Sequence, residues 1–160
     1  MHIEAKLRAL GLELPAPLQP PVGVRLPFAA VRVRGDRAYI AGHGPQLADG
    51  GLAGPFGKVG AEVSLEEANA LARLTALSVL ASLQSALGDL DRVTAWLRVL
   101  GMVNVAPGFT QTPAVINGFS DLIIELYGAE AGIHARSAIG VAELPFSVPV
   151  EVEAEVAIVP

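Results

Sequence analysis

The chain contains no cysteine, and this absence excludes several kinds of site at once. Disulfides, thiolate nucleophiles and zinc ribbons all need cysteine, so we expect none of them. The histidines His2, His43 and His134 are too widely separated to suggest a zinc site, and we predict no metal. No nucleophile elbow or phosphate-binding loop is present either. A chain without cysteine suits the reducing cytoplasm, which is the location that we predict.

Basic runs and long hydrophobic runs are also missing. With 11 Lys and Arg against 16 Asp and Glu, the formal net charge is -5, so we expect no broad electrostatic footprint for nucleic acid or an anionic membrane. The longest uncharged, mostly apolar segment, residues 74–87, is too short to cross a bilayer core of about 30 Å. The first residues lack the basic and then apolar pattern of a signal peptide. These features predict a soluble protein.

Apolar residues are abundant instead, at 52% of the 160 residues, while charged residues make up 17%. This length suits one domain with a substantial core, and neither half changes in composition. We therefore predict a single domain over residues 1–160. A chain with this many apolar residues is expected to expose apolar surface that its core does not bury, which favours a subunit interface.

Hydrophobic periodicity predicts the order of the elements. After an N-terminal helix, the patterns indicate two strands, a long helix, a strand, a second long helix and two strands. The predicted ranges are residues 3–11, 29–34, 37–41, 64–87, 92–105, 112–128, 136–144 and 150–159. Ser64 and Glu67 form a capping box, and Thr112 is the predicted cap of the later helix, with Gly128 as its stop. This order predicts an α+β sandwich with one sheet backed by two helices.

Prolines separate the N-terminal helix from the first strand. Pro15, Pro17, Pro20 and Pro21 prevent regular structure and favour a stiff, extended connector. The helix and this connector form a predicted arm over about residues 1–27. A long loop rich in glycine and proline follows at residues 42–57, and loops of that length usually serve a site or an interface.

Residues 133–159 give the strongest pattern. Val150, Val152, Ala154, Val156 and Ile158 alternate with Glu151, Glu153, Glu155 and Ala157, so the strand has one apolar and one acidic face. We predict that the last two strands form a hairpin that turns near Phe146. Arg136 would then face about residue 157, roughly 20 Å from Glu151 at about 3.4 Å per residue. A site that uses both residues would therefore need two subunits.

Arg136 is a fixed cation on a strand of small and apolar residues, and it is the first candidate for a binding site. Its planar guanidinium can hold a carboxylate with two hydrogen bonds. Alternatively, Arg136 pairs with an acid across an interface, and Glu151 is a solvated or interface glutamate. His43 is either an acid or base near neutral pH or a loop histidine with an ordinary hydrogen bond.

Several of these stretches together resemble the reactive-intermediate deaminase family, also called the RidA or YjgF-like family. The matched stretches are residues 38–42, 57–60, 87–93, Phe109, Ile116 and Asn117, residues 134–145 and residues 150–154. The block from Arg136 and Ser137 to Leu144 and Pro145, placed before an alternating glutamate strand, is the most specific. The extended N-terminus resembles the longer subfamily. The resemblance implies a chorismate-mutase-like fold and a homotrimer with clefts between subunits.

The resemblance also implies an activity, the hydrolysis of enamine or imine intermediates such as 2-aminoacrylate to a 2-keto acid and ammonia, without a cofactor. Arg136 would bind the substrate carboxylate, Glu151 would position and activate water, and the backbone at Gly42 and Ala138 would orient the amino group. Asn117 matches a polar cleft residue of the family. The chain departs from the family pattern at two substrate-binding positions, with Phe28 in place of tyrosine and His43 in place of the usual glutamine.

Two other functions remain open. A non-catalytic trimer that senses or sequesters a small carboxylic acid would keep Arg136 and tolerate Phe28 and His43. Ribonuclease or translation-inhibitor activity, ascribed to some relatives, would call for a basic groove lined by aromatic residues, and the acidic charge weighs against it.

Overall fold

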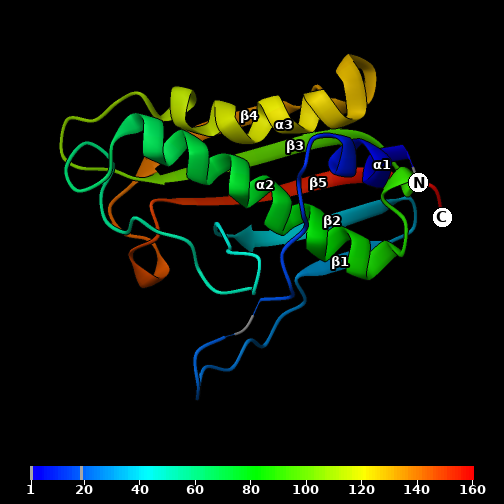
Figure 1. Ribbon diagram of the computed structural model, residues 1–160, viewed down its shortest axis with the longest axis horizontal. Coiled ribbons are helices and arrows are strands. Elements are labelled where there is room, and N and C mark those ends of the chain that lie inside the picture. Colours follow the sequence, from blue (N-terminus) through cyan, green and yellow to red (C-terminus); the bar gives the residue numbers. More distant parts are fainter. Residues whose placement is uncertain (1, 19) are drawn as a thin grey trace.

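The computed structural model of the chain describes residues 2–18 and 20–160, and it has one mixed five-stranded sheet with helices on one face (Figure 1). Met1 and Gln19, both part of the predicted arm, lie outside the described residues. The α+β class and the single sheet backed by two long helices are as predicted. The elements are α1 (His2–Ala9), β1 (Val31–Arg34), β2 (Arg37–His43), α2 (Leu65–Leu87), η1 (Leu90–Arg92), β3 (Val93–Asn104), α3 (Thr112–Gly132), β4 (Ala135–Val141), η2 (Pro145–Ser147) and β5 (Val150–Ile158).

The strand order is β1-β2-β5-β3-β4, and it corrects one prediction. The last two strands do not form a hairpin. Instead β5 lies antiparallel between β2 and β3, while β4 pairs with the other edge of β3 in parallel. The reason is the β3–α3–β4 unit, since a strand, a crossover helix and a strand place the two strands side by side in parallel. Residues 142–149 then lead the chain from β4 to β5.

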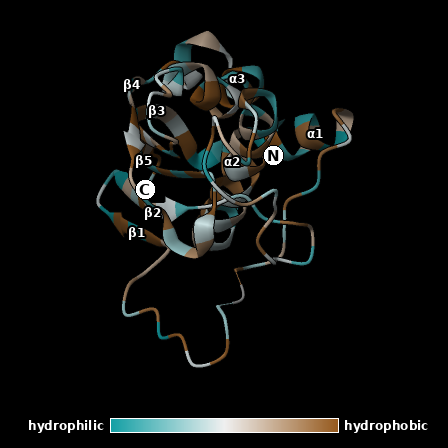
Figure 2. Cartoon of the chain, turned by 90° about the vertical axis from the view of Figure 1, so that its left-hand side faces the viewer, coloured by the Kyte–Doolittle hydropathy of each residue, from teal (hydrophilic) through white to brown (hydrophobic). Residues whose placement is uncertain are grey.

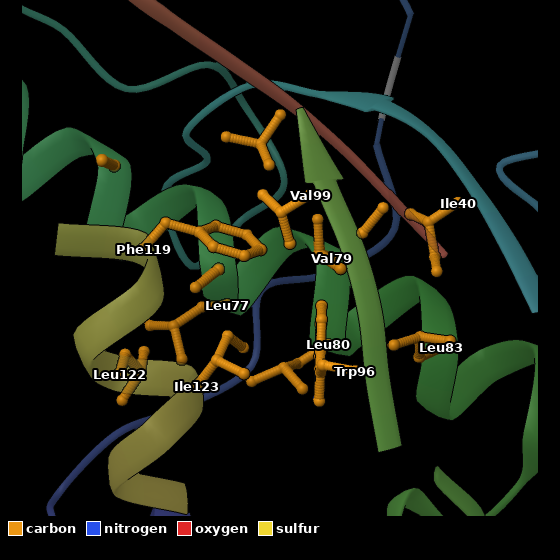
Figure 3. Packing of buried hydrophobic residues seen from close by; sticks show 14 of the residues in the cluster. Ile40, Leu77, Val79, Leu80, Leu83, Trp96, Val99, Phe119, Leu122 and Ile123 are labelled. Atoms are coloured by element: carbon orange, nitrogen blue, oxygen red, sulfur yellow. The ribbon is translucent and has the colours of Figure 1, made fainter. Parts of the chain in front are cut away.

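The core lies between the sheet and the two long helices. In β5 the apolar residues Val150, Val152, Ala154, Val156 and Ile158 are buried, as their alternation predicts. Figure 3 shows how β3 contributes Trp96 and Val99 to this core, against Leu80 and Leu83 of α2 and Phe119 of α3. The residues of β5 that alternate with its buried apolar residues, among them the glutamates, therefore point to the sheet face that carries no helix.

The two long helices begin and end largely where the sequence indicates. The capping box of α2 is present, with Ser64 and Glu67 bonded reciprocally, and Gly88 closes the helix in the left-handed conformation. By length and hydropathy α2 resembles a membrane span, but 56% of that stretch is buried in the protein, as in the core helix of a globular domain. The predicted cap of α3 is wrong: Thr112 is its first helical residue, and its hydroxyl donates to the Ala138 carbonyl oxygen. Gly128, the predicted stop, interrupts α3, which then continues to Gly132.

The N-terminal segment is fixed at its start and projects away from the body further on. The carboxylate of Asp91 accepts hydrogen bonds from the backbone amides of His2 and Ile3 at 2.6 and 2.9 Å, and Pro15 is buried. Beyond it, the described residues between 17 and 30 are exposed. Figures 1 and 2 both show this part extending from the body next to β1 and β2.

The face of the sheet without helices carries apolar side chains among its charged ones. Tyr39 and Ile139 are exposed there, and Leu100 and Met102 are partly buried. The charged residues Arg37 and Glu155 form an ion pair of 2.6 Å on the same face. This uncovered face is the spare apolar surface that the composition predicts.

Candidate functional site

The predicted site residues fall into two separate groups in one chain. Arg136, Asn117 and Ala138 lie at β4 and α3, whereas Phe28, Gly42, His43 and Glu151 line one cavity beside β2 and β5. Arg136 is in register with Val99 of β3, which is itself in register with Ala154 of β5. Glu151 is therefore two strands away from Arg136, which is about 10 Å across the sheet. It also lies three residues from Ala154 along β5, which adds about 10 Å in the strand direction.

The two side chains also point to opposite faces of the sheet. Arg136 contacts α3, on the helix face. Glu151 alternates with the buried Val150 and Val152 and so points to the face without helices. The geometry of one chain therefore keeps Arg136 and Glu151 apart.

The guanidinium of Arg136 is held by neutral oxygen atoms. Its Nη1 donates to Asn117 Oδ1 at 3.0 Å and to Ser120 Oγ at 3.1 Å, and its Nη2 lies 3.4 Å from the Pro113 carbonyl oxygen. Among the ion pairs of the described residues, none includes Arg136. The side chain is partly exposed, and its positive charge has no acidic partner among the residues that the structure describes, so it is suited to bind an anion.

A partly buried histidine, His134, orients this arrangement. The Nδ1 atom of His134 lies 2.8 Å from the Gly132 carbonyl oxygen, which can only accept, so Nδ1 carries the proton. Nε2 must then accept from the Ser120 hydroxyl at 2.9 Å, which leaves the Ser120 oxygen free to accept from Arg136. Burial lowers the pKa of His134; the Gly132 hydrogen bond opposes this, and the charge of Arg136 lowers the pKa further. His134 is thus kept neutral, in the form that this network requires.

Ala138 contributes its carbonyl oxygen to the same region. That oxygen accepts from Thr112 Oγ1 at 3.0 Å, which joins the start of α3 to β4. Asn117 lies five residues further along α3, and its Oδ1 accepts from Arg136. The sequence analysis missed Ser120 and the role of His134, although Ser120 follows Asn117 by three residues and therefore lies on the same helix face.

The second group lies in a cavity of about 1050 Å³ beside the end of β2. Its walls include Phe28, Gly42, His43 and Glu151 together with residues of the arm and of α2. The cavity lies beyond the start of β1. Val31, the first residue of β1, pairs with Ile40, and β2 continues to His43 without a paired β1 residue.

Glu151 is the acidic group of this cavity and is packed against Gly42. A Cβ atom at residue 42 would overlap with Glu151 Oε1, so only glycine leaves room for the carboxyl group there. Burial raises the pKa of Glu151, and the negative charge of Glu153 raises it further. A carboxyl group with a raised pKa is a better proton acceptor when ionised, which suits a general base.

His43 faces α2 rather than open solvent. Its Nδ1 lies 2.6 Å from the Ala41 carbonyl oxygen and its Nε2 lies 2.8 Å from Ser82 Oγ, so Nδ1 donates and Nε2 accepts. Burial lowers the pKa of His43, and the bond to Ala41 partly offsets this effect. Because both ring nitrogens have partners, this geometry matches an ordinary hydrogen-bonded histidine more closely than a free acid or base.

Within the described part of the chain, the carboxylates close enough to share a cation are those of Glu4, Asp89 and Asp91. None of these residues is a predicted site residue. Oε1 of Glu4 accepts from the Leu90 amide at 3.0 Å, and Asp91 accepts from the first amides of α1. The acidic group thus joins α1 to η1 and has a structural role.

We predict that Gly42→Ala displaces the carboxyl group of Glu151 without unfolding the chain, because the clash falls on the end of a flexible side chain. Displacement into solvent removes part of the burial, so the pKa of Glu151 should fall toward the ordinary glutamate value. A carboxyl NMR titration measures this. Gly44→Ala is the matched control, since its new methyl group meets its neighbours at 3.8 Å, an ordinary contact. An unchanged pKa in Gly42→Ala would show that Glu151 does not pack on Gly42.

Comparisons with known proteins agree with this fold. Residues 4–152 match the family model described as "YjgF/chorismate_mutase-like, putative endoribonuclease". Protein TCP17 of Trypanosoma cruzi is 40% identical over 153 residues, which cover 96% of this chain and 92% of that protein.

Solved structures with similar sequences also have this fold. The protein Atu1372 of Agrobacterium tumefaciens, whose function is unknown, is 35% identical, with a TM-score of 0.86 over 98% of this chain and 92% of its own. A structure from Shewanella oneidensis, described as a "putative endoribonuclease", is 30% identical, with a TM-score of 0.88 over 99% of this chain and all of its own.

More distant structures, RidA from a Psychrobacter species and the YjgF gene product of E. coli, are each 20% identical, with TM-scores of 0.58 and 0.60, and show the fold alone. The matched stretches, the fold and the near full-length family match lead to one conclusion: the chain belongs to the YjgF/chorismate mutase-like family.

Proposed function

We propose that the protein hydrolyses small 2-imino acids, and the enamines that tautomerise to them, to 2-keto acids and ammonia. The observation that carries this proposal is the uncompensated guanidinium of Arg136, which is held by Asn117 and Ser120 with no acidic partner among the described ion pairs. Such a cation is suited to the carboxylate that every 2-imino acid carries. E. coli TdcF, which shares the fold at 19% identity and a TM-score of 0.60, has a crystal structure with bound serine, a ligand of similar size.

The site that we propose is formed by two subunits of a homotrimer. Arg136 of one copy holds the carboxylate, and Glu151 of a neighbouring copy faces the imine carbon. The separation of these residues in one chain supports this arrangement. The uncovered sheet face, with Tyr39, Leu100 and Ile139, supplies apolar surface for the contact between copies.

The chemistry needs one water molecule and no net change in oxidation state. Glu151 as a carboxylate accepts a proton from water while the water oxygen bonds to the imine carbon, and the protonated Glu151 then gives that proton to the imine nitrogen. In the resulting carbinolamine, Glu151 carries the hydroxyl proton to the amino nitrogen as the C–N bond breaks. Ammonia leaves, the carbon becomes the ketone of a 2-keto acid, and Glu151 is again a carboxylate. Because the imine carbon is already electrophilic, holding the substrate and water in place together with proton transfer through Glu151 is sufficient.

The deciding experiment measures ammonia and keto acid release from imino acids generated in place by an amino acid oxidase. We expect acceleration by the wild type and a loss of about 10- to 150-fold in kcat/KM for Arg136→Ala, the range for hydrogen bonds to a charged group. Arg136→Lys should recover only part of this, because lysine lacks the planar fork. Arg8→Ala, at an exposed position of α1, is the control.

The outcomes separate the functions. Absence of acceleration, combined with keto acid binding that Arg136→Ala abolishes, would replace the hydrolase by a protein that binds or senses small acids. RNA cleavage that falls with rising salt would support the endoribonuclease named in the description of the family. The net charge of -5 argues against that activity, since backbone contacts to RNA need cations.

The pH dependence gives a second prediction. Glu151 acts as a base only when ionised, so activity should fall as the pH drops through its pKa, which burial and Glu153 raise. Glu153→Gln removes a neighbouring negative charge, so the pKa of Glu151 falls and the acidic limb of the kcat profile moves to lower pH. A limb that does not move, or that moves to higher pH, would exclude Glu151 as the titrating base.

A further inference from the structure

We propose that the cavity beside Glu151 selects 2-imino acids, and their 2-keto acid products, that carry a large apolar side chain, and that the N-terminal arm is its specificity-determining wall. This inference rests on the proposed function of the same site for the class of acid that it names. The arm here means the segment of residues 12–28 that leads from α1 toward β1.

The size of the cavity is the first observation. Its volume of about 1050 Å³ lies slightly above the range of roughly 300–1,000 Å³ for pockets that hold drug-sized ligands. A three-carbon acid such as 2-aminoacrylate would leave most of this space to water. The cavity therefore suits a substrate with a much larger substituent.

The lining of the cavity gives the polarity of that substituent. Glu151 lies beside Gly42, and Ser82 and Ser85 are among the polar side chains of the wall from α2. Leu18, Val24 and Leu26 supply apolar wall from the arm, although each is 40 to 45% exposed in the single chain. When an apolar substituent of a ligand covers these side chains, it removes their apolar surface from water. Binding is therefore stronger for ligands with longer aliphatic or aromatic groups.

The base of the arm is fixed to the body. The Ala16 amide donates to the Ala48 carbonyl oxygen at 3.0 Å, and Gln46 Nε2 donates to the Ala16 carbonyl oxygen at 3.4 Å. Gly50 has a φ of 91°, and a Cβ atom there would lie 2.7 Å from the Pro17 carbonyl oxygen, so the arm crosses the loop closely at this glycine. The prolines that follow restrict the backbone, which lowers the entropy that ligand binding must remove.

Phe146 lines the same cavity from the connection between β4 and β5 and is held in an unusual conformation. Phe146 and Ser147 both have a φ of 57°, a region that residues other than glycine seldom adopt. Phe146 is 57% exposed as a residue, and the Ser147 carbonyl oxygen accepts from the Gly57 amide at 2.8 Å. The connection thus holds an aromatic side chain at the cavity in a backbone conformation of the kind often found at ligand sites.

The test is calorimetric titration of the full-length protein with pyruvate, 2-oxobutanoate, 2-oxopentanoate and 2-oxohexanoate. We expect Kd to fall by about fourfold for each added methylene group, as for transfer of a methylene from water to an apolar site. The double variant Val24→Ser, Leu26→Ser should flatten this dependence on chain length. Val22→Ser is the matched control, because Val22 lies on the same arm, is fully exposed and is not among the residues that line the cavity.

Each outcome decides one question. A Kd independent of chain length, or a dependence that survives in the double variant, overturns the inference, and the imine hydrolysis assay is unaffected by that result. A dependence that the double variant loses supports the inference even where no imine is hydrolysed, in which case only the proposed reaction fails. A third outcome combines two results: the wild type binds none of the keto acids, and the double variant no longer forms the oligomer. The arm would then be a subunit contact, which also overturns the inference.

Discussion

The alternation of β5 is the constraint on which the rest of the structure depends. This strand lies between β2 and β3, and its Val and Ala side chains fill the core under α2 and α3. A shift of one residue would place the five buried positions of β5 on the uncovered face and the glutamates in the core, which the cost of burying unpaired charge forbids. The register of β5 therefore determines that Glu151 points away from the helices.

The same constraint accounts for the division of the candidate site. Because β5 is central and β4 is an edge strand, Glu151 and Arg136 are separated by β3 and point to opposite faces. Each group is nevertheless held in place. Hydrogen bonds to Asn117 and Ser120 orient Arg136, and His134 orients Ser120, while the absence of a side chain at Gly42 leaves space for the Glu151 carboxyl group. Two half-sites of complementary chemistry in one chain favour a site that two copies complete.

The cavity and the arm extend this picture from the reacting groups to the rest of a ligand. Beyond its base the described residues of the arm are exposed, yet the arm contributes an apolar wall to the cavity that Glu151 also lines. Under the proposed function, a wall of this kind would affect which acids bind and would leave the chemistry to Arg136 and Glu151. The positioning of the reacting groups and the choice of substrate would therefore belong to different segments of the chain.

Local signals in the sequence predicted most elements, because each depends on residues close together in the chain. The capping box at Ser64, the glycine at 88 and the alternation of β5 all have this local character. The neighbours of β5 could not be read from such signals, since strand pairing depends on contacts between distant residues; only the strand, helix and strand at β3, α3 and β4 pointed to a parallel pair. Similarly, Arg136 and Glu151 were indicated by residue type and by the family resemblance, whereas Ser120 and His134 were not, because their roles arise from hydrogen bonds formed in the fold.

The most direct test of a site shared between subunits is complementation between two inactive variants. Arg136→Ala keeps Glu151, and Glu151→Gln keeps Arg136, so neither variant alone can form a complete shared site. When the two are coexpressed in equal amounts with different tags, random assembly in a cyclic trimer should restore about a quarter of the wild-type sites. Recovery of imine hydrolysis near that level is the result that the account predicts. Mixed assemblies that copurify and yet remain inactive, beside an active wild type, would contradict it.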